Sequence, residues 1–413
     1  MMRNERRARA ELEARQLEAL RTLIRHAYGH VRIYRELYDD AGVEPRDLRS
    51  LSDLRFLPTI SKRDLQACEP ADAIDDRIED RRTLLSIKTS GSSGASLEFF
   101  IDSGHDQLRK AQYLRPYLST GRRLRDRLLR FSSETTAPQS WFNKIGLMRE
   151  RLIYADSDVA KHIDTIKAEQ PDIIQGFGSE LVLIAREILD TGLRVPSPRL
   201  IYTDSELLTG GFRKIIEQTF GVPVLDVYGT YEIGNVGYEC TEHSGYHLAE
   251  DCVITEILDE AGRPVEPGMS GELVFTSLHN TTMPFIRYRI GDSASSSPTD
   301  CACGRTFKRM TGLQGRMTDF VRCEDGSLRS PTALIGAFDR LADRVREFQV
   351  VQQEIDSFEV RVVPKGTLDP DLEYALRAAL TTEFPRAAVR VTAMASIPRS
   401  ASRKYKAFVQ ECA

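Results

Sequence analysis

Three apolar stretches, DIIQGF (172–177), RLIYTDSELL (199–208) and VPVLDVYG (222–229), indicate the fold of the chain. Each is short and rich in branched or aromatic residues, which favours a buried strand. Helical patterns separate the stretches, one with Ser179 as its expected N-cap and one over Gly211–Phe220. Strands that alternate with helices favour a parallel sheet with helices packed on it, so this part of the chain predicts an α/β fold.

The pattern changes toward the C-terminus. VITEILD (253–259) and GELVFTSL (271–278) predict a pair of antiparallel strands. Further on, EFQVVQQ (347–353) and FEVRVV (358–363) alternate as strands do, and Asp369 is a suitable N-cap because a proline follows it. These signals predict a small α+β unit at the end of the chain.

Length and composition agree with a protein of more than one domain. The chain has 413 residues, of which 41% are apolar and 29% charged, which is enough for sizeable cores. Apolar residues at spacings of three and four predict a helical segment within residues 1–75. We expect a large N-terminal domain over residues 1–316 and a small α+β domain over residues 317–413.

The composition also argues against several classes of function. The formal net charge of −4 does not favour binding to nucleic acid or to anionic membranes. No apolar run reaches the roughly 18–20 residues that span a bilayer, and the charged N-terminus lacks a signal-peptide core. Seven cysteines, an odd number without a dense framework, favour a reducing cytoplasm over secretion.

A loop of glycine and serine lies between two strand-like runs. Glycines let a backbone approach a ligand closely, and backbone N–H groups with hydroxyls can cradle phosphate oxygens. The loop is not a Walker loop, because no Gly-Lys-Ser/Thr follows, and an ordinary hairpin loop is the alternative. The loop consists of Thr89, Ser90, Gly91, Ser92, Ser93 and Gly94.

Two acidic residues follow strand-like runs further along the chain. Glu232 ends YGTYE (228–232), beyond a strand, where open α/β sheets bind ligands, and its carboxylate suits Mg²⁺. Asp292 ends MPFIRYRIGD (283–292) and is suited to accept hydrogen bonds from a ribose diol. The alternatives are a solvated acid at Glu232 and a structural ion-pair cluster around the arginines before Asp292.

The cysteines and histidines suggest a metal site. Cys301 and Cys303 lie on one tight loop, and Cys240 lies upstream with His243 and His247. Three thiolates and one imidazole form a tetrahedral set that zinc favours, and a closed set of four is structural. His247 is the preferred histidine because it begins the strand-like run HLAEDCVI. Unconnected cysteines are the alternative.

The last candidate is Lys404 in IPRSASRKYK (397–406). A lysine on a mobile domain can neutralise charge that develops on a phosphate. Taken alone, a basic surface tail is the better interpretation of this segment.

In their order along the chain, these segments resemble the adenylate-forming enzymes. The order is TSGSSG, YGTYE, GELVFTSL with MPFIRYRIGD, GRMTD (315–319) and a late lysine. CACGR (301–305) narrows the resemblance to the phenylacetate–CoA ligase and CapK-like branch, over essentially the whole chain. The resemblance implies an acyl-CoA synthetase-like fold with a rotating C-terminal domain. It also implies that a carboxylate attacks the α-phosphorus of ATP, giving acyl-AMP and pyrophosphate, and that a thiol, usually coenzyme A, then takes the acyl group.

Position by position, the resemblance assigns roles to the candidate residues. The loop from Thr89 to Gly94 would hold the β- and γ-phosphates, and Lys404 would be the adenylation lysine. Glu232 would bind Mg²⁺, and a zinc knuckle would lie within residues 240–303. The remaining roles are adenine contact for Asp204, Ser205, Glu206, Tyr228 and Gly229, contact with phosphate or the acyl carboxylate for Thr230, and ribose binding for Asp292 and Arg316.

The sequence departs from the family pattern at a few positions. Ala95 and Ser96 stand where the family loop often continues with Lys-Pro, which removes one cation that faces phosphate. Arg403 replaces the glycine that commonly precedes the final lysine, and Thr318 stands where a hinge acid or lysine is frequent.

The activity expected from these observations is that of an ATP-dependent acid–CoA ligase. One alternative is the same adenylation with an amine or a carrier-protein thiol as acceptor, and another is a nucleotide-binding protein with impaired catalysis. The acid is not readable from the sequence. Pocket walls are expected around residues 132–141 and 176–178, and an aromatic acid would suit Phe131, Trp141, Phe142 and Phe177, although such residues more often form core. A homodimer is expected from the family alone.

Overall fold

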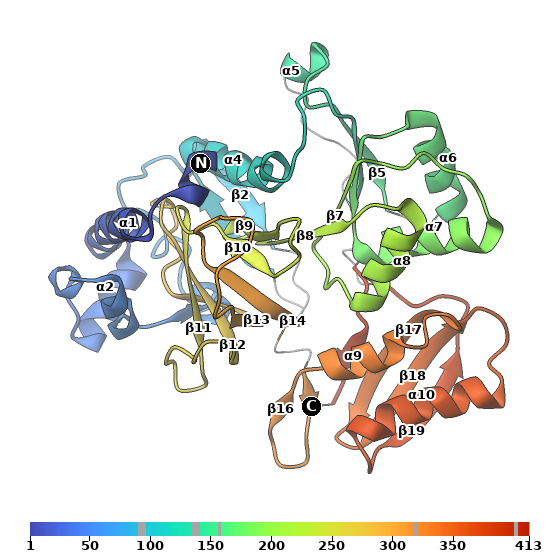
Figure 1. Ribbon diagram of the computed structural model, residues 1–413. Helices are drawn as coiled ribbons and strands as arrows, with labels where there is room; N and C mark the ends of the chain where they lie inside the picture. Colours follow the sequence, from blue (N-terminus) through green and yellow to red (C-terminus); the bar gives the residue numbers. More distant parts are fainter. Residues whose placement is uncertain (90–95, 134–140, 156–157, 317–319, 400–403, 413) are drawn as a thin grey trace. The chain divides into compact units, whose positions relative to one another are not determined.

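The computed structural model describes residues 1–413 except 90–95, 134–140, 156–157, 317–319, 400–403 and 413 (Figure 1). The chain divides into two compact units. The first unit comprises residues 1–121 and 227–313, and the second comprises residues 122–226 and 314–413. The domain boundary between residues 316 and 317 stays a prediction, because it concerns separate motion rather than packing.

The first unit begins with a mainly helical segment. Its long helix α1 (Arg9–His30) buries one apolar stripe that includes Leu20, Leu23 and Ile24, as spacings of three and four require. The other helical elements of this unit are α2 (Arg32–Ala41), α3 (Lys62–Ala67), α4 (Ser103–Ser119) and the short 3₁₀ turns η1 (Met2–Arg6), η2 (Pro45–Asp47), η3 (Leu51–Phe56) and η4 (Arg81–Thr83).

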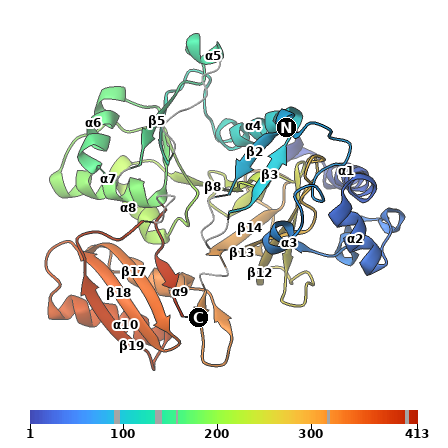
Figure 2. The same ribbon diagram turned by 180° about the vertical axis from the view of Figure 1, so that it is seen from behind.

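A largely antiparallel sheet forms the rest of the first unit, with strand order β11-β12-β13-β14-β10-β9-β8. The antiparallel pairing of β11 with β12 confirms the prediction for these two segments. The short β1 (Ile60–Ser61) pairs with β13, and β2 (Leu85–Lys88) forms a separate hairpin with β3 (Glu98–Ile101) (Figure 2). The strands are β8 (Val224–Thr230), β9 (Gly234–Glu239), β10 (Tyr246–Leu248), β11 (Val253–Leu258), β12 (Ser270–Ser277), β13 (Tyr288–Ser296) and β14 (Arg309–Arg316).

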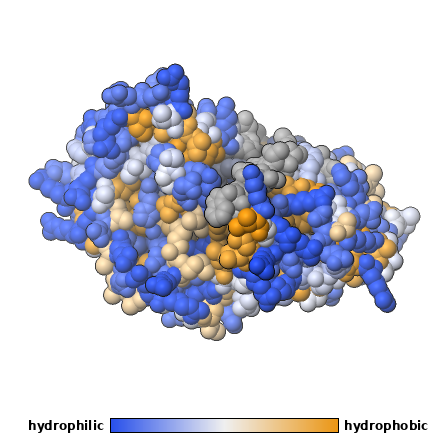
Figure 3. Space-filling model, turned by 90° about the horizontal axis from the view of Figure 1, so that it is seen from above, coloured by the Kyte–Doolittle hydropathy of each residue, from blue (hydrophilic) through white to orange (hydrophobic). Residues whose placement is uncertain are grey.

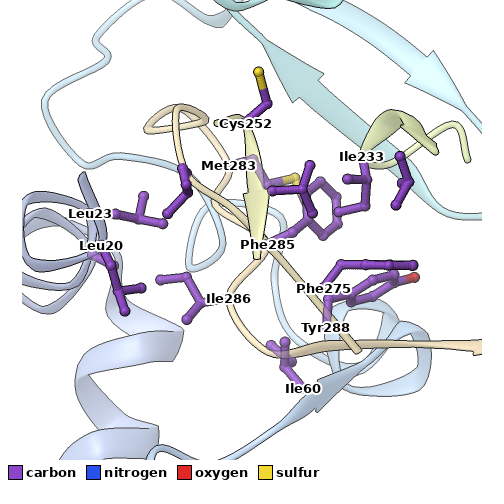
Figure 4. Packing of buried hydrophobic residues seen from close by; sticks show 14 of the residues in the cluster. Leu20, Leu23, Ile60, Ile233, Cys252, Phe275, Met283, Phe285, Ile286 and Tyr288 are labelled. Atoms are coloured by element: carbon purple, nitrogen blue, oxygen red, sulfur yellow. The ribbon is translucent and has the colours of Figure 1, made fainter. Parts of the chain in front are cut away.

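The core of the first unit lies between helix α1 and this sheet. Phe275, Phe285 and Tyr288 are almost fully buried, and the Phe285 ring meets the Tyr288 ring edge-on at 5.0 Å (Figure 4). Leu20 and Leu23 of α1 belong to the same cluster. Burial of this kind contributes roughly 1.5–3 kcal/mol for each large side chain.

The second unit contains the strand–helix alternation from which the sequence predicted the fold. Strands β5, β4, β6 and β7 pair in this order and are all parallel, which confirms the α/β class. The prediction that Ser179 is the N-cap of the helix between β6 and β7 was wrong: the N-cap is Phe177, and Ser179 lies inside the first turn of α7. The elements are β4 (Leu128–Ser132), α5 (Trp141–Lys144), β5 (Glu150–Tyr154), α6 (Val159–Glu169), β6 (Ile173–Gly176), α7 (Gly178–Thr191), β7 (Leu200–Asp204) and α8 (Gly210–Phe220).

The C-terminal part of the second unit has a core of its own. A sheet of order β19-β18-β17-β20 packs against helices α9 and α10 (Figure 1). Asp369 caps α10 as predicted, because its carboxylate accepts a hydrogen bond from the Leu372 N–H at 2.7 Å. The elements are β15 (Val321–Arg322), β16 (Leu328–Arg329), α9 (Thr332–Asp339), β17 (Val345–Glu354), β18 (Ser357–Pro364), α10 (Pro370–Glu383), β19 (Ala388–Ala393) and β20 (Phe408–Gln410).

Among the described residues, no helix combines the length and the hydropathy that crossing a bilayer requires. The face drawn in Figure 3 carries mainly hydrophilic residues with apolar ones scattered between them, as is usual on protein surfaces.

Candidate active site

The start of the glycine-serine loop is fixed by two hydrogen bonds. The Thr89 hydroxyl accepts one from the Leu97 N–H at 2.9 Å and one from the Lys62 ammonium group at 3.3 Å. The rest of the predicted loop, residues 90–94, lies outside the described residues. Lys62 is a cation at this site that the sequence analysis missed, since nothing in its local pattern links the first residue of α3 to a loop 27 positions later.

Four predicted site residues lie on β8, just after it, and on β13, and side-chain hydrogen bonds link the two regions. The Tyr228 hydroxyl donates a 2.6 Å hydrogen bond to the Asp292 carboxylate. Tyr288, the first residue of β13, donates to the Glu232 carboxylate at 3.2 Å. The Thr230 hydroxyl accepts from the Ile233 N–H at 3.1 Å, which shapes the turn between them. The two carboxylates are therefore oriented by tyrosine hydroxyls, one from β8 and one from β13.

Gly229 is required by the packing of this turn. A Cβ atom at this position would lie 2.8 Å from the Asn235 side-chain oxygen and 2.9 Å from the Gly234 carbonyl oxygen. No larger residue fits without moving the backbone, so the glycine sets how tightly β8 approaches β9 next to Thr230 and Glu232.

Helix α4 adds a cation to the same region. The Arg109 guanidinium donates to the Glu232 carbonyl oxygen at 3.3 Å, and its centre lies 5.8 Å from the middle of the Phe99 ring. Burial lowers the pKa of Arg109, although Asp106 and Glu232 favour its charged form. The sequence analysis did not identify Arg109, because its position on a helix gives no local sign of a site.

His105 lies one helical turn before Arg109 and is 5% exposed. Burial, together with the nearby Arg109 charge, lowers its pKa to about 4. Between pH 6.5 and 4 an unfolded histidine takes up a proton whereas the folded one does not, so the free energy of unfolding should fall by about 3 kcal/mol over this range. Urea unfolding of wild type and His105→Gln at several pH values tests this. In the variant, the free energy of unfolding should depend much less on pH over this range. The same pH dependence in both proteins would contradict the expectation.

The predicted adenine segment, residues 204–206, lies in the second unit and begins with the last residue of β7. Asp204 accepts a short hydrogen bond from the Gln175 amide, and Ser205 adopts a left-handed backbone conformation with φ of 66°. The Glu206 carboxylate accepts hydrogen bonds from the Ser179 N–H at 3.1 Å and from the Tyr405 N–H at 2.5 Å. Burial raises the pKa of Glu206.

The two remaining predicted residues, Arg316 and Lys404, also belong to the second unit. Both are half-buried. Arg316 is the last residue of β14, and Lys404 immediately precedes Tyr405. The predicted site residues are thus divided between the units.

The predicted metal ligands converge in the first unit. One ligand atom from each of Cys240, His247, Cys301 and Cys303 lies within 4.8 Å of the others. The Cys240 and Cys301 sulfur atoms are 3.6 Å apart, and the Cys303 sulfur lies 3.3 Å from His247 Nε2. His243 is not in this set, and its Nδ1 lies 3.9 Å from the Glu239 carboxylate.

The electrostatics of the cluster suit a metal ion. Burial raises the pKa of Cys240 to about 12. Burial alone would raise the pKa of Cys301 as well. Hydrogen bonds from Ser244 and Cys303 outweigh this effect and lower the pKa of Cys301 to about 7. Burial lowers the pKa of His247 to about 4, which keeps its imidazole neutral and able to ligate at neutral pH. Close thiols of this kind are stabilised when a cation takes up their charge.

Two of the aromatic residues expected near an acid pocket are core residues. Phe131 and Phe177 are 1% and 5% exposed and pack in the cluster formed by the sheet and helices of the second unit. A Cβ atom on Gly176 would lie 2.9 Å from the Phe131 Cβ, so Phe131 closes that face of β6. Residues 134–140 lie outside the described part of the chain.

The sequence of this chain is similar to those of known ligases and of CapK. A phenylacetate-coenzyme A ligase of Thermus thermophilus is 29% identical over 379 residues, which are 86% of this chain and 82% of that enzyme. The chain is related to the phenylacetate–CoA ligases. CapK of Staphylococcus aureus, a further relative of the same branch, is 25% identical over 348 residues and matches 79% of this chain and 74% of its own. The resemblance stated from the sequence is therefore confirmed.

The fold of this chain is similar to that of a solved acyl-CoA ligase structure. A 2-hydroxyisobutyryl-CoA ligase in the postadenylation state superposes with a TM-score of 0.78 at 23% identity, over 98% of this chain and 90% of that one. The adenylate-forming fold predicted for the chain is confirmed by this similarity. No protein-family model matches the sequence.

Proposed function

We propose that this chain is an ATP-dependent acid–CoA ligase that forms an acyl-AMP and pyrophosphate and then transfers the acyl group to the thiol of coenzyme A. The relationship to phenylacetate–CoA ligases carries the proposal. The hydrogen-bonded pairs of Tyr228 with Asp292 and of Tyr288 with Glu232 support it, since they hold two carboxylates in place.

The first step makes few chemical demands on the protein. A carboxylate is already ionised near neutral pH, so no general base is needed. The reaction needs alignment of the acid with the α-phosphorus and neutralisation of phosphate charge. In the proposed site Asp292 and Arg316 bind the ribose, the segment that starts at Thr89 holds the outer phosphates, and Lys404 neutralises charge at the reacting phosphate.

Two metal ions belong to the proposal. Glu232 would hold Mg²⁺, which supplies charge neutralisation when bound with ATP, and the buried carboxylate is of the type that hard cations prefer. The cluster of three cysteines and His247 would hold a structural zinc, because it offers four ligands and leaves no position for water.

Lys62 should take part in phosphate binding. Its ammonium group lies beside Thr89, and the loop lacks the lysine that the family often has after its last glycine, where Ala95 stands. We expect Lys62→Met to raise the KM for ATP about tenfold, the usual effect of losing one charge-assisted contact, with little change in stability. Steady-state kinetics with varied ATP measures this, with Lys88→Met on the exposed face of β2 as the control. Equal effects of the two substitutions would contradict the assignment.

Pyrophosphate exchange tests the proposed function. The purified protein should catalyse exchange of labelled pyrophosphate into ATP when a suitable acid is present, with phenylacetate as the first acid to test. AMP release that depends on coenzyme A supports coenzyme A as the acyl acceptor. AMP release that depends on an amine or a carrier protein would show that this other compound is the acceptor instead. ATP binding without exchange for any acid of a broad panel would instead indicate a nucleotide-binding protein.

A further inference from the structure

The Glu206 carboxylate joins two distant parts of the second unit. One oxygen accepts the Ser179 N–H at the start of α7, and the other accepts the N–H of Tyr405. Both donors are backbone groups, so the carboxylate fixes the course of the main chain on each side. This use leaves neither oxygen free of a partner, although the sequence analysis had expected Glu206 beside adenine.

Tyr405 itself is held tightly. The centre of its ring lies 5.7 Å from that of Phe212 on α8. The Arg399 guanidinium lies over the Tyr405 ring, 4.9 Å from the ring centre. Its hydroxyl donates a short hydrogen bond to the Phe348 carbonyl oxygen. The residue after Lys404 is therefore anchored by side chain and by backbone, which restricts where the lysine can point.

A second carboxylate also links the two stretches of chain that form the second unit, residues 122–226 and 314–413. Asp339, the last residue of α9, accepts hydrogen bonds from the Gly211 N–H at 2.9 Å and from the Thr209 hydroxyl at 3.1 Å. Both donors lie at the N-terminus of α8, where a negative charge is favourable. A Cβ atom on Gly211 would lie 2.6 Å from the Asp339 carboxyl carbon, so this close approach requires glycine.

We propose that Glu206 is a positioning residue for acyl-adenylate formation, which holds Lys404 at its place of action through the backbone of Tyr405. The inference rests on the proposed function, because it gives Lys404 its role. Asp339 supports the same arrangement from α9. The second step, attack of a thiol on the acyl-AMP, does not use Lys404 in this scheme. Loss of the Glu206 contact should therefore impair the first step selectively.

The substitution Glu206→Gln tests this with little change in shape. A glutamine keeps one acceptor oxygen, but its amide nitrogen then faces an N–H donor, so one of the two hydrogen bonds is lost. We expect the rate of pyrophosphate exchange to fall about tenfold or more. The rate of acyl-CoA formation from added acyl-AMP should change by less than about twofold. Asp339→Asn should show the same split with a smaller effect.

Glu217→Gln is the matched control. Glu217 on α8 accepts the Val224 N–H at 2.9 Å and thus makes a backbone contact confined to residues 122–226. It should leave the ratio of the two half-reactions unchanged. Equal losses in both half-reactions of Glu206→Gln would show a merely structural role and overturn the inference. If wild type catalyses no exchange with any acid, the proposed function itself fails, and the two failures are distinct.

Discussion

Replacing Lys404 by alanine should lower the rate of acyl-adenylate formation about a thousandfold, as expected when a preorganised cation is removed from a developing phosphate charge. Lys404 is half-buried and directly precedes Tyr405, whose N–H is bound by the Glu206 carboxylate, so the backbone that carries the lysine is fixed. Removing the side chain beyond Cβ takes away the charge but leaves the hydrogen bond between Tyr405 and Glu206 intact. Pyrophosphate exchange measures the first step alone.

The second half-reaction and a neighbouring lysine serve as controls for Lys404→Ala. Acyl transfer from added acyl-AMP to coenzyme A should be nearly unchanged, and thermal unfolding should stay within a few degrees of wild type. Lys406→Ala removes a charge two positions away and should retain most of the exchange activity. A Lys404→Ala variant that exchanges pyrophosphate at close to the wild-type rate would exclude this residue from catalysis.

Disrupting the proposed metal site of three cysteines and His247 should cause the largest loss of stability among these substitutions. Protein purified without chelator should contain about one zinc per chain, because the four ligand atoms already lie together. Replacing Cys240 with serine should lower the free energy of unfolding by about 3 kcal/mol or more and release the metal, since metal binding free energy contributes directly to folding. Elemental analysis and urea unfolding measure the two effects.

Cys323→Ser is the matched control for the metal cluster. Cys323 is half-buried in the turn between β15 and β16, outside the cluster, and its replacement should change stability little. Strong chelators should destabilise wild type and the control but not Cys240→Ser. Finding no metal in freshly purified wild-type protein would contradict the zinc assignment.

The fold was largely predictable because its signals are local. Short apolar runs between helical patterns mark the parallel strands of the second unit, and Asp369 followed by proline marks the start of α10. The error at Ser179 has a clear cause. A serine at a helix start is usually a cap, but here Glu206 takes up the N–H of Ser179 from another segment, and a local pattern cannot show such a partner.

The site was predictable only in part, for the same physical reason. Glu232, Asp292 and the cysteines could be named because their residue types suit particular ligands. Lys62 and Arg109 could not be found, because each lies on a helix with no local sign and reaches its partner only in the folded chain. The two tyrosines that orient the carboxylates likewise meet them only in the folded chain, since each hydrogen bond joins residues more than 50 positions apart.

The route of oxygen from the acid to the nucleotide tests the central claim most directly. An acid that supports exchange, labelled with heavy oxygen in its carboxylate, is converted with ATP and coenzyme A, and the products are analysed by mass spectrometry. Attack of the carboxylate on the α-phosphorus predicts that the AMP formed carries one labelled oxygen. Unlabelled AMP, or label in inorganic phosphate together with ADP, would contradict acyl-adenylate formation by this chain.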